Sequence, residues 1–404
     1  MATVETKACA LCAKSKRRCS RGLPACARCV ARSLPCIYPA SKQTCWVMSD
    51  YMGVIPIKSP ASTATTNGNE SGPLPSPLLG FEAVIRPLPP MISPSPGSLT
   101  LADLQSAWFL TPDTWVIRQV PAEAAASVIE RRNSPMLERF ARQMKNLMTD
   151  WVEKGSSGLF HSRFYQRRLP RCAQDAFTAL SAYSVRVPKT ENMVLRILGE
   201  RLEQLVVEYA DAARLDPFEH VARVHAMLIY VMLGLFDGDI RLRHLAETHL
   251  STLETWRLEM LDAARAAANN GQLLMGGLLD RDNGEPTTQV ETFWHAWILT
   301  ESVRRAWFIA SGIQTCYSMM REGKLRCAGG LMLTTRVGVW DAKTAWAWTK
   351  LCAEKDVGFV TQAQIGRLFD ETKPEEVDDF GKLLLEAMYG VEQLESWGVR
   401  VEPL

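Results

Sequence analysis

Residues 9–36 read CALCAKSKRRCSRGLPACARCVARSLPC, and their six cysteines repeat one spacing twice. Each half has the form C-x2-C-x6-C, and six residues separate the two halves. A structural zinc ion takes four tetrahedral ligands, so two zinc ions need eight ligand positions where this segment offers six thiolates. Two cysteines must therefore bridge the two ions. The repeat makes Cys9 and Cys26, the first cysteine of each half, the natural bridges.

With these bridges the segment supplies two complete zinc sites. One consists of Cys9, Cys12, Cys19 and Cys26, and the other of Cys26, Cys29, Cys36 and Cys9. Along its whole length the segment resembles the binuclear zinc cluster DNA-binding domain of fungal transcription factors, in which six cysteines hold two zincs. The resemblance implies two short helices around two zinc ions per chain in residues 1–45, and a place in the nucleus.

Other uses of the cysteines are disfavoured. A disulfide framework suits secreted chains, but residues 1–20 contain five lysines and arginines and no apolar stretch typical of a signal peptide. A single zinc finger built from the two C-x2-C pairs would leave Cys19 and Cys36 idle, although they occupy equivalent places in the two halves. A redox C-x2-C motif needs a strand and helix context that these basic, proline-containing surroundings do not provide. Finding one zinc per chain instead of two would contradict the binuclear interpretation.

The N-terminal segment is strongly basic. Residues 1–45 contain nine lysines and arginines against one glutamate, a net charge of +8, which leaves −6 for the other residues within the total of +2. Two zinc ions and six thiolates carry a formal charge of about −2. The surrounding cations, not the cluster, would therefore attract phosphate through counterion release. A solvated basic face, or a nuclear import signal at residues 14–18, is the alternative to the double-stranded DNA binding that we predict.

Lys16 is the predicted base-reading residue. A helix that begins at the first C-x2-C pair would end near residues 16–18, where cations are favourable. In the family that the segment resembles, a lysine four residues after the second cysteine reads the guanines of a CGG half-site, and Lys16 holds that place. The other predicted DNA-binding residues, which would contact phosphate and fix the register, are Lys14, Arg17, Arg18 and Arg21.

Two residues depart from the family pattern. Ser15 stands where the family usually has a basic residue, and Ala10 stands where it usually has aspartate. Pro24, two residues before Cys26, matches the proline that turns the chain between the two halves. The departures concern DNA affinity or base preference and leave the metal ligands unaffected.

The composition changes abruptly after Pro39. Between Pro39 and Pro96 lie eleven of the 22 prolines, together with polar runs such as residues 62–72. We therefore interpret residues 46–99 as a flexible linker. The family often places a dimerising coiled coil just after the cluster, but no apolar heptad can be written between residues 41 and 98. A homodimer would therefore form through the part of the chain that follows.

Residues 100–404 show a helical pattern, and we predict one large all-α regulatory domain. Thr100 and Asp103 open one helix, Ser134 opens another, and Asp216 with Pro217 opens a third, which runs through residue 236. No alternating strand series appears, and no apolar stretch reaches the ~20 residues that a membrane span needs. The remaining predicted helices cover residues 171–184, 190–212, 239–266, 286–321, 342–353 and 375–397.

Two segments of this region resemble the regulatory helical domain of fungal transcription factors. The first carries its W-x-x-W…E-x-x-R-R signature in Trp294, Trp297, Glu301, Arg304, Arg305 and Trp307. The second, residues 331–348, resembles a later segment of that domain through Trp340, Ala342 and Trp346. Glu301 and Arg305 are spaced as an i, i+4 pair, and tryptophans commonly fill a core. We therefore interpret the signature as core and not as an effector pocket.

The sequence predicts a regulator and not an enzyme, because cysteines would fill every zinc position and leave none open for water. The resemblance implies a nuclear, sequence-specific transcription factor that acts on the transcription machinery. The short chain, the absent coiled coil and the compact helical domain resemble pathway-specific positive regulators of fungal secondary-metabolite gene clusters. Two alternatives stay open: a regulator of nutrient catabolism or drug resistance, and a chromatin-recruited cofactor that does not itself read sequence.

Overall fold

The computed structural model describes two compact units, residues 1–59 and 60–404, which are treated separately below. In the first unit the described residues are Cys12, Ser15, Cys19, Ser20 and residues 27–32. In the second unit they are residues 107–119, 134–274, 288–323, 329–354 and 356–401. The predicted domain boundaries near residues 45 and 99 lie outside the described residues.

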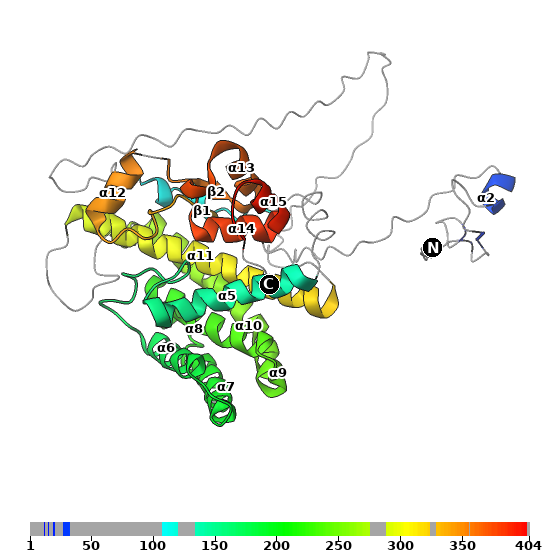
Figure 1. The fold of residues 1–404 in the computed structure, drawn as a ribbon, viewed down its shortest axis with the longest axis horizontal. Coiled ribbons are helices and arrows are strands. Elements are labelled where there is room, and N and C mark those ends of the chain that lie inside the picture. Colours follow the sequence, from blue (N-terminus) through cyan, green and yellow to red (C-terminus); the bar gives the residue numbers. More distant parts are fainter. Residues whose placement is uncertain are drawn as a thin grey trace, which may run out of the picture. The chain divides into compact units, whose positions relative to one another are not determined.

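The second unit is mainly helical, as predicted (Figure 1). Its α-helices are α5 (Ser134–Lys154), α6 (Arg171–Ser184), α7 (Glu191–Glu208), α8 (Pro217–Phe236), α9 (Ile240–Thr248), α10 (Leu250–Asn269), α11 (Gln289–Glu322), α12 (Ala345–Glu354), α13 (Leu368–Glu371), α14 (Asp379–Tyr389) and α15 (Val391–Ser396). Its 3-10 helices are η1 (Trp108–Leu110), η2 (Pro112–Trp115), η3 (Ala212–Arg214), η4 (Gln272–Leu274), η5 (Gln362–Arg367) and η6 (Pro374–Glu376). Its strands are β1 (Met332–Thr334) and β2 (Phe359–Thr361).

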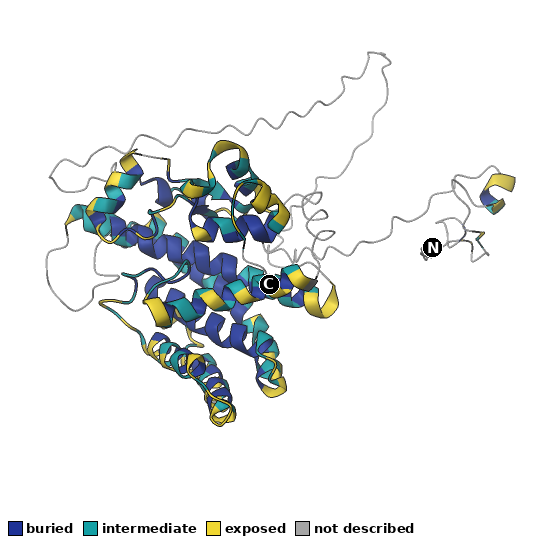
Figure 2. Ribbon diagram, in the orientation of Figure 1, coloured by how far each residue is buried: buried dark blue, intermediate teal, exposed yellow. Residues whose placement is uncertain are grey.

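Helix α8 lies at the centre of the packing. It begins at a capping box in which the Asp216 side chain accepts from the backbone of Glu219 and the Glu219 side chain accepts from Asp216 N–H, with Pro217 in the first turn. Almost every residue of α8 is buried, and the helix packs against α6, α9, α10 and α11. Figure 2 shows the same burial along much of α11.

By length and composition alone, the 20-residue helix α8 could cross a membrane. The uninterrupted apolar run is shorter, because Arg223 and His225 lie inside the helix. Of the most apolar window, 94% is buried inside the unit. Arg223 itself is paired there with Glu259, at 2.5 Å between Nη2 and Oε2. We therefore interpret α8 as a core helix.

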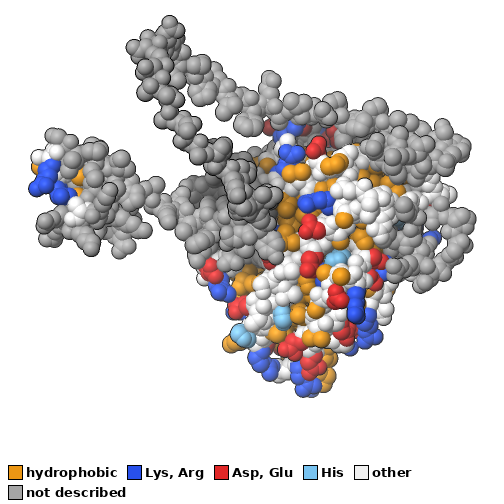
Figure 3. Space-filling view, turned by 180° about the vertical axis from the view of Figure 1, so that it is seen from behind, with side chains coloured by type: hydrophobic (Ala, Val, Ile, Leu, Met, Phe, Trp, Pro, Cys, Tyr) orange, Lys and Arg blue, Asp and Glu red, His pale blue; other side chains and the backbone are white. Residues whose placement is uncertain are grey.

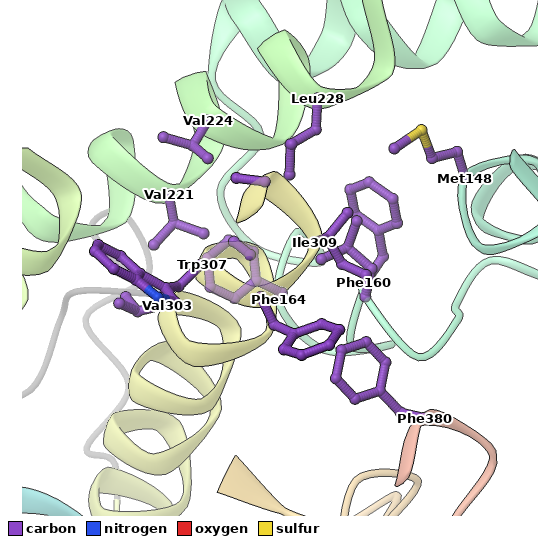
Figure 4. Packing of buried hydrophobic residues seen from close by; sticks show 14 of the residues in the cluster. Met148, Phe160, Phe164, Val221, Val224, Leu228, Val303, Trp307, Ile309 and Phe380 are labelled. Atoms are coloured by element: carbon purple, nitrogen blue, oxygen red, sulfur yellow. The ribbon is translucent and has the colours of Figure 1, made fainter. Parts of the chain in front are cut away.

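Helices α8 and α11 contribute to one apolar cluster. Figure 4 shows Val221 and Val224 of α8 near Val303 and Trp307 of α11. The signature tryptophans Trp294, Trp297 and Trp307 are all buried, which agrees with their interpretation as core.

Several predicted helices are interrupted. The predicted helix over residues 239–266 is split into α9 and α10 at His249, and the one over 375–397 is split into α14 and α15 at Gly390. Gly390 has φ 87°, a left-handed conformation that glycine adopts without steric cost. Helix α7 ends at Glu208, earlier than predicted.

The sequence analysis missed two features. Strands β1 and β2 form an antiparallel pair in which Leu333 lies opposite Val360, and each strand is only three residues long, too short for a recognisable alternation. The segment that follows the predicted helix start at Thr100 and Asp103 forms the 3-10 helices η1 and η2. Thr100 and Asp103 themselves lie outside the described residues.

Candidate zinc centre and DNA interface

The first unit places cysteines from both halves of the repeat in protected positions. Cys12, which has helical backbone geometry, and Cys29, in the short helix α2 (Ala27–Ala31), have 0% of their surface exposed. Cys19 is half-buried. The other three predicted ligands, Cys9, Cys26 and Cys36, lie outside the described residues.

Local hydrogen bonds hold the described part of this unit together. The Ser20 Oγ accepts from the N–H of Ala27, at 2.8 Å, and so ties the segment after the first half to the start of α2. Within the first half, the Ser15 hydroxyl donates to the carbonyl of Cys12. In the second half, the N–H of Arg32 donates to the carbonyl of Cys29 and closes the end of α2.

One side chain crosses between the halves. The Arg28 Nη1, from α2, donates to the Cys12 Sγ at 3.6 Å and to the Ser15 Oγ at 2.9 Å. A hydrogen bond from a donor outside the ligand set orients a sulfur ligand toward its metal. Buried sulfur ligands with a cationic donor beside one of them therefore fit a zinc-thiolate centre. From the sequence, Arg28 was expected only to add to the basic charge of the segment. The small side chain of Ser15 was the one signal that could have pointed to this contact.

The predicted DNA-binding residues are Lys14, Lys16, Arg17, Arg18 and Arg21, and all five lie outside the described residues. Ser15, in the middle of this run, is exposed. The two basic side chains that are described in this unit, Arg28 and Arg32, lie at least partly at its surface, where Figure 3 shows basic atoms in blue. The roles of the five residues in DNA binding stay predictions.

The described residues of both units contain no group of three or more His, Cys, Asp or Glu side chains that could hold a metal. In the helical unit, burial raises the pKa of the Cys172 and Cys352 thiols to about 12. Both thiols are therefore protonated at neutral pH and unsuited to zinc. Among the residues described, the case for zinc thus concerns the first unit alone.

The signature of the helical unit forms a buried polar network around Arg305. Its Nε donates to Glu301 at 3.3 Å, and its Nη1 donates to the carbonyl of Gly158 at 2.9 Å. Its Nη2 donates to the carbonyl of Thr334 at 3.2 Å and to the carboxylate of Asp378 at 2.8 Å. Arg305 and Glu301 are completely buried. One side chain therefore joins α11 to β1, to the loop after α5 and to the residue that caps α14.

Arg304, its neighbour, anchors the first described segment of the unit. Its Nη2 donates to the carbonyl of Phe109 at 2.6 Å and to the Thr114 hydroxyl at 3.2 Å, and its guanidinium lies 4.6 Å from the ring centroid of Trp115. Burial lowers the pKa of Arg304 to about 10, so the side chain stays charged at neutral pH. The network is structural, and it contains no nucleophile or open metal position.

A groove of about 590 Å³ lies over part of this network, between α5, α14 and the C-terminal segment. Its floor includes Arg305, Trp340 and Asp378, and its walls include the Arg139–Glu386 ion pair. The groove lining mixes charges of both signs with few apolar side chains, whereas ligand pockets are predominantly apolar. This composition agrees with the interpretation of the signature as core.

Comparison with known proteins agrees with the site. Residues 7–45 match the Fungal Zn(2)-Cys(6) binuclear cluster domain, a range that includes all six cysteines of the repeat. Over 409 residues the chain is 22% identical to Transcription factor gsfR2 of Penicillium aethiopicum, with 97% of this chain and 94% of that protein covered. No solved structure matches the chain. Residues 7–45 are therefore a Fungal Zn(2)-Cys(6) binuclear cluster domain, and the chain as a whole resembles a fungal transcription factor; together they indicate a zinc-binding and DNA-binding regulator and not an enzyme.

Proposed function

We propose that this transcription factor recognises CGG-type half-sites through Lys16, with two zinc ions held by the six cysteines of residues 9–36. The observation that carries the proposal is the repeated C-x2-C-x6-C spacing inside the matched domain, together with a lysine at the family's base-reading place. A lysine amine can donate to guanine O6 and N7 in the major groove, a pattern that distinguishes guanine from the other bases. Lys14, Arg17, Arg18 and Arg21 would bind phosphate and set the register.

Binding measurements with short duplexes test this assignment. The zinc-loaded full chain should bind a CGG-containing duplex more tightly than a duplex of the same composition with the CGG scrambled. The affinity for both should fall steeply with salt, because the +8 segment releases counterions from phosphate. Equal affinity for the two duplexes would favour the cofactor that does not itself read sequence.

We further propose that the protein is a nuclear, positive regulator of a fungal secondary-metabolite gene cluster. Support comes from the lack of an apolar heptad between residues 41 and 98, and from a match that covers 97% of this chain and 94% of a fungal transcription factor. Mapping the tagged protein on its own chromatin tests the proposal. Peaks over one run of neighbouring promoters with CGG-like sites would support it and name the pathway. Scattered CGG-containing peaks would instead favour a regulator of nutrient catabolism or drug resistance.

Homodimerisation through the helical unit is part of the proposal. Helix α7 supports it, because Met193, Ile197 and Val207 are exposed on one helical face at spacings that fit an a/d heptad, with Glu200 and Gln204 between them. Val207 is the most exposed of these three apolar side chains, with 78% of its surface exposed.

The assembly state of an α7 variant tests this interface. The V207E substitution should shift the mass measured by light scattering toward the monomer. The matched control I240E changes an equally exposed residue at the start of α9, which is not part of the exposed α7 face, and should leave the mass unchanged. A mass unaffected by V207E, or a wild-type monomer, would exclude α7 as the dimer interface.

A further inference from the structure

Arg28 occupies an unusual place, because it belongs to one half of the cysteine repeat and contacts the other. It lies in α2 next to Cys29, and its Nη1 reaches the Cys12 sulfur and the Ser15 hydroxyl at 3.6 and 2.9 Å. Both sulfurs are fully buried, whereas Arg28 is half-buried and Ser15 is exposed. The guanidinium therefore lies between the protected sulfur and the surface of the first half.

Electrostatics explains how this contact would stabilise the zinc cluster. A cluster of two zinc ions and six thiolates carries a formal charge of about −2, and a partly desolvated charge of that size is stabilised by a nearby cation. Hydrogen bonds from donors outside the ligand set also orient the ligands of a metal and tune their donor strength. Arg28 supplies the charge and the donor together. It also has the fixed planar fork that lets one guanidinium engage several acceptors, which lysine lacks.

The residue at position 15 makes room for this arrangement. A basic side chain there, as in the family pattern, would place a second cation beside the Arg28 guanidinium, and two like charges at that distance repel each other. Serine instead offers a small, neutral acceptor at 2.9 Å. The departure from the family pattern at Ser15 and the contact made by Arg28 therefore have one physical explanation.

We infer that Arg28 is a positioning residue of the zinc centre, which locks the two halves of the repeat together and fixes the position of the Cys12 sulfur. The inference rests on the proposed two-zinc cluster. The contact would fix the orientation, relative to α2, of the segment that carries Cys12 and Ser15 and that leads into the predicted base-reading residue Lys16. Loss of the contact should therefore loosen zinc first and weaken DNA binding as a consequence.

The test uses the full zinc-loaded chain and compares R28Q, R28K and the control R32Q. Arg32 carries the same charge on the exposed turn after α2, so R32Q removes an equal charge from a different position. Zinc transfer to a chromophoric chelator measures how firmly the metal is held. R28Q should weaken zinc binding by about 10-fold or more, a typical effect of removing a residue that orients a ligand. R28K should recover part of this loss, and R32Q should behave like the wild type.

A spectroscopic measurement separates a contact with sulfur from a general effect on folding. In the cobalt-substituted chain, R28Q should shift the sulfur-to-metal charge-transfer band to lower energy, because a hydrogen bond lowers the energy of the sulfur lone pairs. R32Q should leave the band unchanged. Unchanged zinc transfer and an unchanged band in R28Q would overturn the inference. Equal losses of DNA affinity in R28Q and R32Q, with zinc held normally, would overturn it too, by making Arg28 a phosphate contact.

The number of zinc ions per chain distinguishes failure of the Arg28 inference from failure of the proposed two-zinc cluster. A wild-type chain with two zincs and an R28Q chain that behaves normally would contradict only the role of Arg28. A wild-type chain with one zinc would contradict the binuclear cluster itself. Should R28Q fail to fold, S15A removes the 2.9 Å acceptor of Arg28, together with the hydroxyl's own bond to the Cys12 carbonyl, and should show the same changes at smaller size.

Discussion

The two units of this protein are held together in different ways, although each uses an arginine to join distant segments. The first unit is short, and among its described residues the buried side chains are the cysteines Cys12 and Cys29, which would be held by metal. The second unit buries the 20-residue helix α8 almost completely, and its buried Arg304 and Arg305 hold other segments of the unit to α11. The comparison teaches that function and fold stability are separable here: zinc should control DNA binding, whereas the apolar core and its buried ion pairs should control the helical unit.

Removing zinc should have the largest effect, and it should abolish DNA binding without changing the stability of the helical unit. A strong chelator should abolish DNA binding, because a small zinc module without metal loses its folded state. The melting temperature of the helical unit, followed by tryptophan fluorescence, should stay the same, because its described residues contain no group of metal ligands. Coupled melting of both units after chelation would break the comparison.

The R305M substitution should give the reverse result. It leaves the buried carboxylate of Asp378 without its cation and leaves Glu301 with the cation of Arg304 alone, at 4.0 Å, and breaking a buried pair in this way costs about 3–5 kcal/mol of unfolding free energy. Urea denaturation measures the loss, and zinc content should not change. The control R367M removes an exposed pair with Glu371 and should cost less than about 1 kcal/mol. Similar losses in both variants would mean that the buried network is not what stabilises the unit.

As the pH falls, the helical unit should begin to lose stability before its carboxylates become protonated. Burial lowers the pKa of His161 and of His225 to about 3, well below the ordinary value near 6.5. The unfolded chain therefore binds more protons than the folded one, and stability is lost as pH falls from about 6.5 toward 3. Each histidine should cost roughly 2 kcal/mol at pH 5.

Urea denaturation at pH 7.5 and pH 5 checks this slope. The H225F variant should reduce the stability difference between the two pH values, because one of the three buried histidines, which include His161 and His220, no longer titrates. An unchanged difference in H225F would show that His225 is accessible to protons in the folded state.

The K16A substitution should give the smallest free-energy change and leave both folds intact. A bidentate contact with guanine contributes about 1–3 kcal/mol of discrimination, so K16A should weaken binding to a CGG duplex more than to random DNA. Fluorescence anisotropy at fixed salt measures both affinities. An equal loss on the two duplexes would assign Lys16 to phosphate and not to base reading.

Much of this architecture is predictable from the sequence, for reasons that particular residues make plain. The capping residue Asp216 satisfies backbone donors locally, so the start of α8 could be located from sequence. The helix predicted from residue 286 instead begins at Gln289, after the capping residue Thr288. The breaks at His249 and Gly390 depend on how neighbouring helices pack, which local patterns do not record. The short strands β1 and β2 likewise exist through tertiary pairing.

The candidate site shows the same division. Cysteine spacing predicts the ligands, because tetrahedral coordination restricts which spacings can close around zinc. The contact between Arg28 and Cys12 joins residues sixteen positions apart and has no local signature. Arg305 is similar: its i, i+4 partner Glu301 could be predicted, whereas its pairing with Asp378, 73 residues away, could not.

Native mass spectrometry of the full chain, purified with zinc, tests the central claim most directly. The account predicts two zinc ions per chain, and loss of zinc from variants of either proposed bridge, C9S or C26S. One zinc per chain, with normal binding to CGG-containing DNA, would contradict the binuclear cluster and with it the physical basis proposed for DNA recognition.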